Sequence, residues 1–156
     1  MRIAYWFTRR GAYGRAEQAA AKLDAVDQRL GDLAELKAAT AVACEYCIDL
    51  GSQIARHRSN ITDEQLLALP DYRESGLFSE LEKRVMDYAV AITRTPAVVP
   101  DELFDALRQH FDERQLVELA FRIALKNLRA RFNLALGVGA AGFSQGAVCA
   151  APLATR

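Results

Sequence analysis

Apolar residues recur every three or four positions along most of this chain, which is the spacing of one face of an α-helix. In the segment 32–42, for example, they stand at Leu33, Leu36, Ala39 and Val42. No segment sustains the apolar–polar alternation of a half-buried strand. The pattern predicts an all-α protein with helices at about 15–30, 32–42, 44–56, 62–69, 79–94, 101–110 and 112–136.

Four of these predicted helices begin with a capping box, in which a Ser, Thr or Asp and a Glu or Gln three residues later each bind the other's backbone N–H. The four pairs are Asp32–Glu35, Thr62–Gln65, Ser79–Glu82 and Asp112–Gln115. Gly14, Gly31 and Gly137 mark breaks between segments. We therefore expect one helical domain at 15–139, an N-terminal arm at 1–14 and an Ala/Gly-rich tail at 140–156.

The last predicted helix is apolar over most of its length, and this predicts a buried central helix. Its apolar residues are Leu116, Leu119, Ala120, Ile123, Ala124 and Leu128. Lys126, Asn127, Arg129 and Arg131 form a polar insertion in it. Either these arginines pair with acids such as Asp32 or Glu35, or they line a subunit interface or an anion pocket.

Composition narrows the class of protein. The chain has 156 residues, 51% of them hydrophobic, and 20 basic side chains balance 20 acidic ones. These values fit one folded domain, and no charge excess suggests a nucleic-acid partner. The first apolar run is too short for a signal peptide, and no run reaches the ~18 apolar residues of a transmembrane helix. Three cysteines indicate a reducing compartment, so we expect a cytoplasmic protein without membrane contact.

Two of the three cysteines, Cys44 and Cys47, are three residues apart. On a helix this spacing brings the thiols about one turn apart, so that one sulfur could attack a substrate and the other could resolve the product as a disulfide. If Cys44 lies at a helix start, unpaired N–H groups and the helix dipole would stabilise its thiolate. The sequence leaves open which cysteine attacks first.

Residues 32–133 resemble the carboxymuconolactone decarboxylase family, on the alkylhydroperoxidase D-like (AhpD-like) branch that keeps the CxxC pair. The residues that carry the resemblance are Cys44-Glu45-Tyr46-Cys47-Ile48-Asp49-Leu50, Thr62-Asp63-Glu64-Gln65, Arg73-Glu74-Ser75, Pro100-Asp101-Glu102-Leu103-Phe104 and the helix from Asp112. The resemblance implies an all-helical fold assembled as trimers or hexamers. It also implies a disulfide-cycling site that reduces peroxides or accepts electrons from a protein or small-thiol donor.

In the active branch of this family, a glutamate and histidines around the CxxC form a proton relay. The matching positions here are Asp32, Tyr46 and Gly51. Asp32 keeps a carboxylate, and it could serve as a relay acid or only as a helix cap. Tyr46 keeps a polar ring, but a phenol is a poor base at neutral pH. Gly51 removes the histidine that follows the second cysteine, so the resemblance implies Cys44, Cys47, Asp32 and Tyr46 as the candidate catalytic residues.

Other candidates for the chemistry are weaker. Asp49 is expected to point away from Cys47, and His57 and His110 are expected at helix ends away from the thiols. Cys149 is either a buried small hydrophobe or a further redox thiol brought back by the tail. No histidine is spaced to complete a tetrahedral zinc site, and we expect neither metal nor cofactor.

Three hypotheses about function follow. The first is a thiol–disulfide oxidoreductase, with peroxide reduction as one form of its activity. The second is a decarboxylase of a lactone acid, although the family's decarboxylases do not depend on a CxxC. The third is an oligomeric binding or redox-sensing protein that has lost the relay histidine at Gly51.

Overall fold

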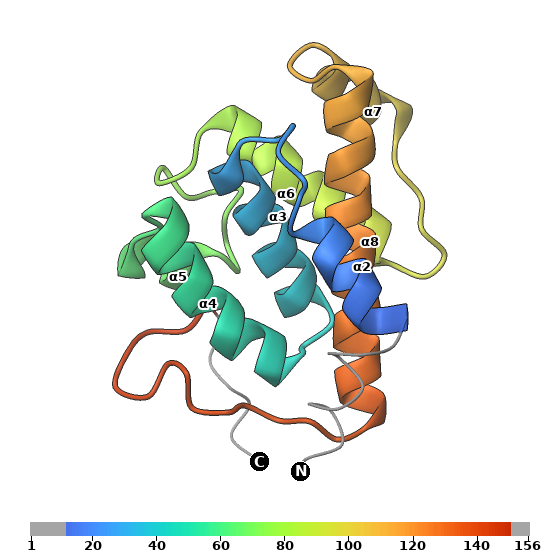
Figure 1. Ribbon diagram of the computed structural model, residues 1–156. Coiled ribbons are helices and arrows are strands. Elements are labelled where there is room, and N and C mark those ends of the chain that lie inside the picture. Colours follow the sequence, from blue (N-terminus) through green and yellow to red (C-terminus); the bar gives the residue numbers. More distant parts are fainter. Residues whose placement is uncertain (1–11, 151–156) are drawn as a thin grey trace.

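The computed structural model describes residues 12–150, and all its regular elements in that range are helices (Figure 1). The predicted all-α class is therefore confirmed. The seven helices are α2 (Ala12–Ala20), α3 (Gln28–Ala41), α4 (Glu45–Ser59), α5 (Asp63–Ala68), α6 (Glu80–Thr93), α7 (Asp101–Arg108) and α8 (Glu113–Ala135).

The helix α3 lies at the centre and packs against α4, α6 and α8 (Figure 1). Its apolar residues occupy two faces. Leu33 and Leu36 join a core cluster with α4, α5 and the C-terminal segment, whereas Ala34 and Ala38 join a second cluster with α6, α7 and α8. Because small alanines face the second cluster, helices can approach α3 closely on that side.

Three of the four predicted capping boxes are confirmed. Thr62, Ser79 and Asp112 each cap a helix, and the partner three residues later binds back in each case. These devices involve only neighbouring residues, so a local sequence pattern is enough to identify them.

The fourth box and the helix expected at 15–30 are wrong. The first described helix ends at Ala20, and α3 starts at Gln28 because the side chain of Asp27 accepts hydrogen bonds from the N–H groups of Arg29 and Leu30. Asp32 is therefore inside α3. Gly31 is also inside α3 and does not break it. Glycine is needed at this position because a Cβ there would lie 2.2 Å from the guanidinium carbon of Arg122.

The predicted arm at 1–14 lies outside the described residues except for 12–14, which begin α2. The helix α2 packs along α8. Tyr13 stacks on Phe132 with ring centroids 5.7 Å apart, and Glu17 pairs with Arg129. The pKa of Tyr13 is raised to about 12 by burial and by the neighbouring Glu17.

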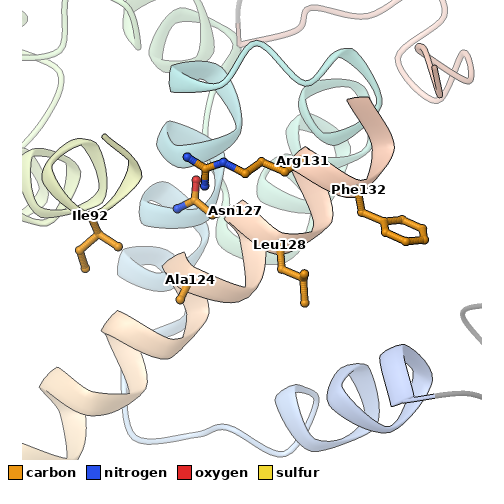
Figure 2. Close-up of a pocket in the computed structure, with 6 residues that line it drawn as sticks. All are labelled: Ile92, Ala124, Asn127, Leu128, Arg131 and Phe132. Carbon is orange, nitrogen blue, oxygen red and sulfur yellow. The ribbon is translucent and has the colours of Figure 1, made fainter. Parts of the chain in front are cut away.

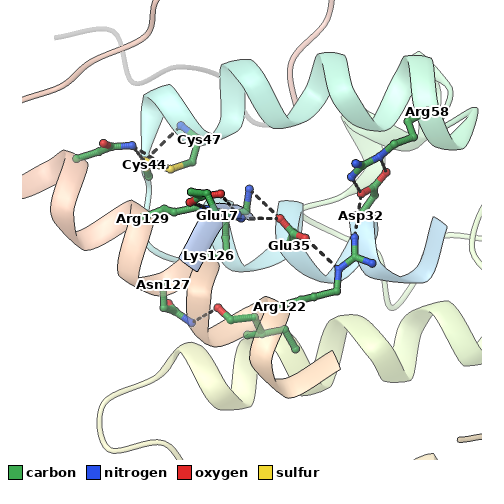
Figure 3. Close-up of polar contacts among 12 residues, drawn as sticks. Glu17, Asp32, Glu35, Cys44, Cys47, Arg58, Arg122, Lys126, Asn127 and Arg129 are labelled. Atoms are coloured by element: carbon green, nitrogen blue, oxygen red, sulfur yellow. Dashed lines mark hydrogen bonds and ion pairs between the residues drawn. A yellow bond between two sulfur atoms is a disulfide. The ribbon is translucent and has the colours of Figure 1, made fainter. Parts of the chain in front are cut away.

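A partly buried ion cluster joins α3 to α8 (Figure 3). The carboxylate of Glu35 contacts Arg122 at 3.0 Å, Lys126 at 3.2 Å and Arg129 at 3.1 Å. One of the predicted alternatives was that the arginines of the polar insertion pair with acids such as Asp32 or Glu35. Arg129 confirms it by pairing with Glu35. Arg131 differs, because it donates to the backbone oxygen of Thr93 and the hydroxyl of Thr95.

The prediction that the last helix is the buried central helix is wrong, because α3 holds the central position and one face of α8 is exposed. Ala124 is exposed, and Val117, Phe121 and Leu128 are 64%, 43% and 51% exposed. These four residues, which we call the α8 stripe, follow the spacing of one helix face. Beside them is a cavity of about 380 Å³ lined by Ile92, Ala124, Asn127, Leu128, Arg131 and Phe132 (Figure 2).

None of the helices within residues 12–150 combines the length and the apolar character that crossing a lipid bilayer requires.

We expect Glu35→Gln to lower the free energy of unfolding by about 3 kcal/mol at pH 7, because it leaves buried cations without their shared counter-charge. Burial alone would raise the pKa of Glu35, but Lys126, Arg122 and Arg129 hold it below its ordinary value of 4.5. The stabilisation is therefore present above that pH and lost as the carboxylate is protonated at lower pH. Urea unfolding at pH 7 and at pH 4 would measure the difference between variant and wild type, which should shrink in acid.

Glu74→Gln is the matched control, because Glu74 is exposed in the loop before α6 and should change stability by less than about 0.5 kcal/mol. Equal losses in the two variants would show that the cluster around Glu35 contributes no special stability.

Candidate redox site

Cys44 and Cys47 form a disulfide at the start of α4. Their Cα atoms are 5.2 Å apart, within the roughly 4.4–6.8 Å that a disulfide spans. Both residues are buried, at 0% and 5% exposed. The structure thus brings the predicted pair of cysteines together. Because both residues are buried, a substrate would reach the sulfurs only after the residues that cover them move.

Cys44 is the N-cap residue of α4, so the condition set for its thiolate in the sequence analysis is met. Its sulfur accepts a hydrogen bond from the backbone N–H of Cys47 at 3.3 Å. A helix start presents unpaired N–H groups and a partial positive charge, and both favour an anionic sulfur. In the reduced protein this position favours the thiolate form of Cys44.

A short connection from α3 sets the position of Cys44. Val42 ends α3, and Ala43 has a φ of +54°, in the left-handed region. An L-residue other than glycine adopts that region at a cost of about 1–2 kcal/mol. Packing of α3 against α4 therefore holds a strained residue directly before the redox pair, and sequence patterns carried no sign of it.

Asn133, in the last turn of α8, also reaches the pair. Its Nδ2 lies 3.6 Å from the sulfur of Cys47 and 4.0 Å from that of Cys44. The sequence analysis did not single out this residue. Its only signal was its position at the end of a polar insertion in an otherwise apolar helix.

Asp32 is not brought to the cysteines. Its buried carboxylate binds Arg58, Ser59, Gln28 and Arg122. Arg58 is near the end of α4, about 20 Å of helix away from the cysteine pair at its start. Figure 3 shows Asp32 and the disulfide at opposite ends of α4.

The other two relay positions lie on the first turns of α4. Tyr46 is half-buried and packs edge-on against Phe143, with ring centroids 5.8 Å apart. Gly51 faces Leu36, since a Cβ there would lie 3.1 Å from a methyl carbon of that residue. His57 is exposed in the last turn of α4 and His110 follows α7, so neither histidine of the chain is on the turn that holds the disulfide.

Asp49 holds the C-terminal segment against α4. We call residues 139–150 the strap. The carboxylate of Asp49 accepts hydrogen bonds from the N–H groups of Ala141 at 2.9 Å, Phe143 at 3.0 Å and Ser144 at 2.6 Å. Burial would raise the pKa of Asp49, but these three donors outweigh it and lower that pKa. This role was missed because the partners are more than ninety residues away in the sequence.

Further contacts continue the strap along α4 (Figure 1). Gln53 donates to the hydroxyl of Ser144, Arg56 donates to the carbonyl of Val148, and Ser52 accepts from the N–H of Ala150. Cys149 is a free, half-buried thiol that packs against the core cluster containing Cys44 and Cys47. Within residues 12–150, no group of three His, Cys, Asp or Glu side chains could hold a metal ion.

No family model matches the chain. It is 39% identical over 121 residues to the uncharacterized protein YnjA of Escherichia coli strain K12, a match that covers 78% of this chain and 66% of YnjA, just under two thirds. It is 30% identical over 121 residues to the uncharacterized protein YdfG of Bacillus subtilis strain 168, which covers 77% of this chain and 82% of YdfG.

Three solved structures share the fold. The debrominase Bmp8 without ligand has a TM-score of 0.75 at 23% identity and covers 85% of this chain and 70% of its own. ATU0492 of Agrobacterium tumefaciens, a protein of unknown function with a suggested link to the antioxidant defence protein AhpD, has a TM-score of 0.72 at 22% identity, covering 90% and 92%. An uncharacterized peroxidase-related protein of Silicibacter sp. TM1040 has a TM-score of 0.68 at 18% identity, covering 81% of this chain and 66% of its own.

The chain belongs to the family of YdfG and YnjA, and its fold is the AhpD-like fold of the carboxymuconolactone decarboxylase family. The resemblance seen in the sequence is thereby confirmed. At these identities the solved structures establish the fold only, and activity has to be argued from the site.

We expect Asp49→Asn to release the strap, because the amide loses the negative charge that three backbone donors share. The free energy of unfolding should fall by about 2 kcal/mol, and Cys149 should be alkylated faster in the folded, oxidised protein. Urea unfolding and the rate of Cys149 alkylation would measure both effects.

Asp105→Asn is the matched control, since Asp105 is exposed on α7. If Cys149 reacts at the same rate in wild type and in both variants, then Asp49 does not hold the strap.

Proposed function

We propose that this protein is a thiol–disulfide oxidoreductase whose redox centre is Cys44 and Cys47. The observation that carries the proposal is the pair itself: two cysteines one turn apart at a helix start, at disulfide distance, with a backbone N–H on the sulfur of Cys44. The AhpD-like fold and the peroxidase-related structural neighbour support it.

In the proposed cycle, the reduced pair gives two electrons to an oxidised substrate and becomes the Cys44–Cys47 disulfide. A protein or small-thiol donor then returns two electrons and two protons to restore both thiols. The low number of cysteines fits a reducing cytoplasm as the setting for this reset. Tyr46 is proposed to shape the entrance through its contact with Phe143, and Asp32 to support α4 through its ion pairs.

Hydroperoxides are one candidate substrate. Their reduction by a dithiol yields an alcohol, water and a disulfide, and the departing oxygen needs a proton. General acid catalysis of this kind is typically worth about 10²–10⁴-fold in rate. Gly51 stands where the resemblance implies the relay histidine, and this favours a second candidate function: a redox sensor that oxidises once and has no rapid turnover.

The redox activity can be tested by titration with a dithiol and by turnover with an oxidant in the presence of excess reductant. Wild type should take up two electrons per chain and turn over repeatedly. Cys47→Ser, made in a Cys149→Ser background, should form no disulfide within the chain and should accumulate a mixed disulfide at Cys44, because no second thiol is present to resolve it.

Cys149→Ser is the matched control and should keep the two-electron step. A wild-type pair that forms its disulfide but does not turn over would favour the sensor. A pair that neither forms nor loses a disulfide under these conditions would rule out both functions.

We also propose that the protein is a homo-oligomer whose copies meet at the α8 stripe. Val117, Phe121, Ala124 and Leu128 are spaced by four, three and four residues, the spacing of a seam between packed helices. An exposed apolar stripe of this length is typical of a surface that another chain covers. The resemblance implies trimers or hexamers.

Leu128→Glu should convert the assembly to single chains, because it places a charge on the stripe. Light scattering coupled to size exclusion would measure the mass. Leu67→Glu on α5 is the control, since Leu67 is 65% exposed but outside the stripe, and it should leave the mass unchanged. A wild type that has the mass of one chain at micromolar concentration would contradict the proposal.

A further inference from the structure

Asn133 is the side chain outside the cysteine turn that donates toward both sulfurs. Its amide nitrogen lies 3.6 Å from the sulfur of Cys47 and 4.0 Å from that of Cys44. A hydrogen bond to an ionised sulfur is stronger than one to a neutral thiol or a disulfide. The contact should therefore matter most after the pair has been reduced.

The end of α8 fixes the position of this side chain. The N–H of Val138 donates to the carbonyl of Asn133 at 2.9 Å, and the N–H of Gly137 donates to that of Leu134 at 3.1 Å. With Gly137 at a φ of +63°, this is a Schellman ending of the helix. One turn earlier, Arg129 is bound to both Glu17 and Glu35. The turn that carries Asn133 is thus held at both ends.

We propose that Asn133 stabilises the reactive thiolate of the reduced pair without exchanging a proton, so that the pair reacts with thiols and disulfides in preference to hydroperoxides. This inference rests on the proposed redox function and names its substrate class. The amide supplies a hydrogen-bond donor to sulfur, but it has no proton to give at neutral pH.

The leaving groups of the two reactions differ in their need for a proton. A departing thiolate has a conjugate acid with a pKa near ~8.5, so it leaves as an anion. A hydroperoxide attacked at its terminal oxygen releases an alkoxide, which is about as strong a base as hydroxide (water has a pKa of about 15.7), and it leaves readily only when an acid protonates it. A site that stabilises sulfur anions and lacks an adjacent acid therefore favours exchange.

Within residues 12–150, the ionisable groups near the pair have contacts of their own. Between the two cysteines, the ring of Tyr46 packs edge-on against Phe143. On α4, Glu45 is beside Gly139 and Asp49 is bound to the strap. On α8, Arg129 is paired with Glu17 of α2 and Glu35 of α3. Both histidines of the chain lie away from the start of α4.

The exchange proceeds in two balanced steps. One cysteine thiolate attacks a sulfur of the substrate disulfide, forming a mixed disulfide and releasing one substrate thiolate with the electron pair of the broken S–S bond. The second cysteine then loses its proton to solvent and attacks the first cysteine sulfur. The Cys44–Cys47 disulfide forms, the second substrate thiolate leaves, and the substrate has gained two electrons.

The first test compares Asn133→Leu and Asn133→Asp with Leu134→Asp, all in a Cys149→Ser background so that only the pair reacts. The pH dependence of alkylation of the reduced proteins gives the pKa of the more acidic thiol. Asn133→Leu should raise it by about one unit, and Asn133→Asp should raise it further because a carboxylate repels the thiolate.

Alkylation at pH 7 should slow about threefold in Asn133→Leu, since the smaller thiolate fraction is partly offset by a more nucleophilic sulfur. Leu134→Asp places the same charge at the next residue, whose side chain is 48% exposed, and it should leave the thiol pKa unchanged. Equal thiol pKa values in wild type and both Asn133 variants would overturn the role of Asn133.

The second test measures oxidation of reduced wild type by a small aromatic disulfide and by cumene hydroperoxide at pH 7. Each rate is divided by that of free glutathione under the same conditions. Because free glutathione also lacks a general acid, the normalised rate for the hydroperoxide should stay near one, about 100-fold or more below what general acid catalysis would give, and the normalised rate for the disulfide should exceed it. Equal normalised rates, or a faster hydroperoxide, would overturn the substrate class.

The two failures are distinguishable. A wild-type pair that reacts with neither oxidant would remove the proposed redox function, whereas the alkylation experiment measures the effect of Asn133 on the thiol in either case.

Discussion

The partly buried carboxylate of Glu35 is held ionised by the cations around it, and this constraint aligns the helices of the protein. Arg122, Lys126 and Arg129 are three to four residues apart, so they lie along one face of α8 and meet a single point on α3. Sliding α8 by one turn would unpair at least one of these charges. Arg122 also forms an ion pair with Asp32, which in turn pairs with Arg58 of α4. Arg129 also pairs with Glu17 of α2. Four helices are therefore held in register by one connected set of charges.

The redox site depends on that register. Asn133 is one turn beyond Arg129, so the position of α8 against α3 also determines where the amide of Asn133 meets the sulfurs. The start of α4 follows α3 through a connection in which Ala43 takes a left-handed conformation. The strap packs along α4, where the carboxylate of Asp49 accepts three hydrogen bonds from its backbone N–H groups. Each of these features comes from a different part of the chain, and together they surround two sulfurs that are almost fully buried.

A fold shared with a debrominase and with a peroxidase-related protein can host more than one chemistry, so the local environment of the sulfurs has to decide the function. In this chain that environment provides hydrogen-bond donors, from the backbone of Cys47 and the amide of Asn133. Donors of this kind stabilise negative charge on sulfur. They differ from a histidine in that they do not carry protons to a leaving group, and this distinction separates exchange between sulfurs from the cleavage of a peroxide.

The sequence by itself determined those features that depend on neighbouring residues. Helix spacing and the capping pairs at Thr62, Ser79 and Asp112 predicted the all-α class and several helix starts, because a cap satisfies backbone groups within three residues of itself. A helix start at Cys44 was considered from the sequence because apolar residues recur at helical spacing after Cys47, and the structure places Cys44 there. A local pattern was also misleading at Asp32, which resembles a cap but is an interior residue of α3.

Only the tertiary structure decided what the remaining polar residues do. Asp32 binds residues 26 and 90 positions away, Asp49 binds the strap 92 to 95 positions away, and Asn133 meets cysteines 86 and 89 positions away. The exposed face of α8 is a further case, since Leu128 has the spacing of a core residue and is 51% exposed among the residues that the structure describes. Helical periodicity shows which residues share a face of a helix. The packing of distant segments determines which other part of the chain, or which solvent-exposed surface, that face meets.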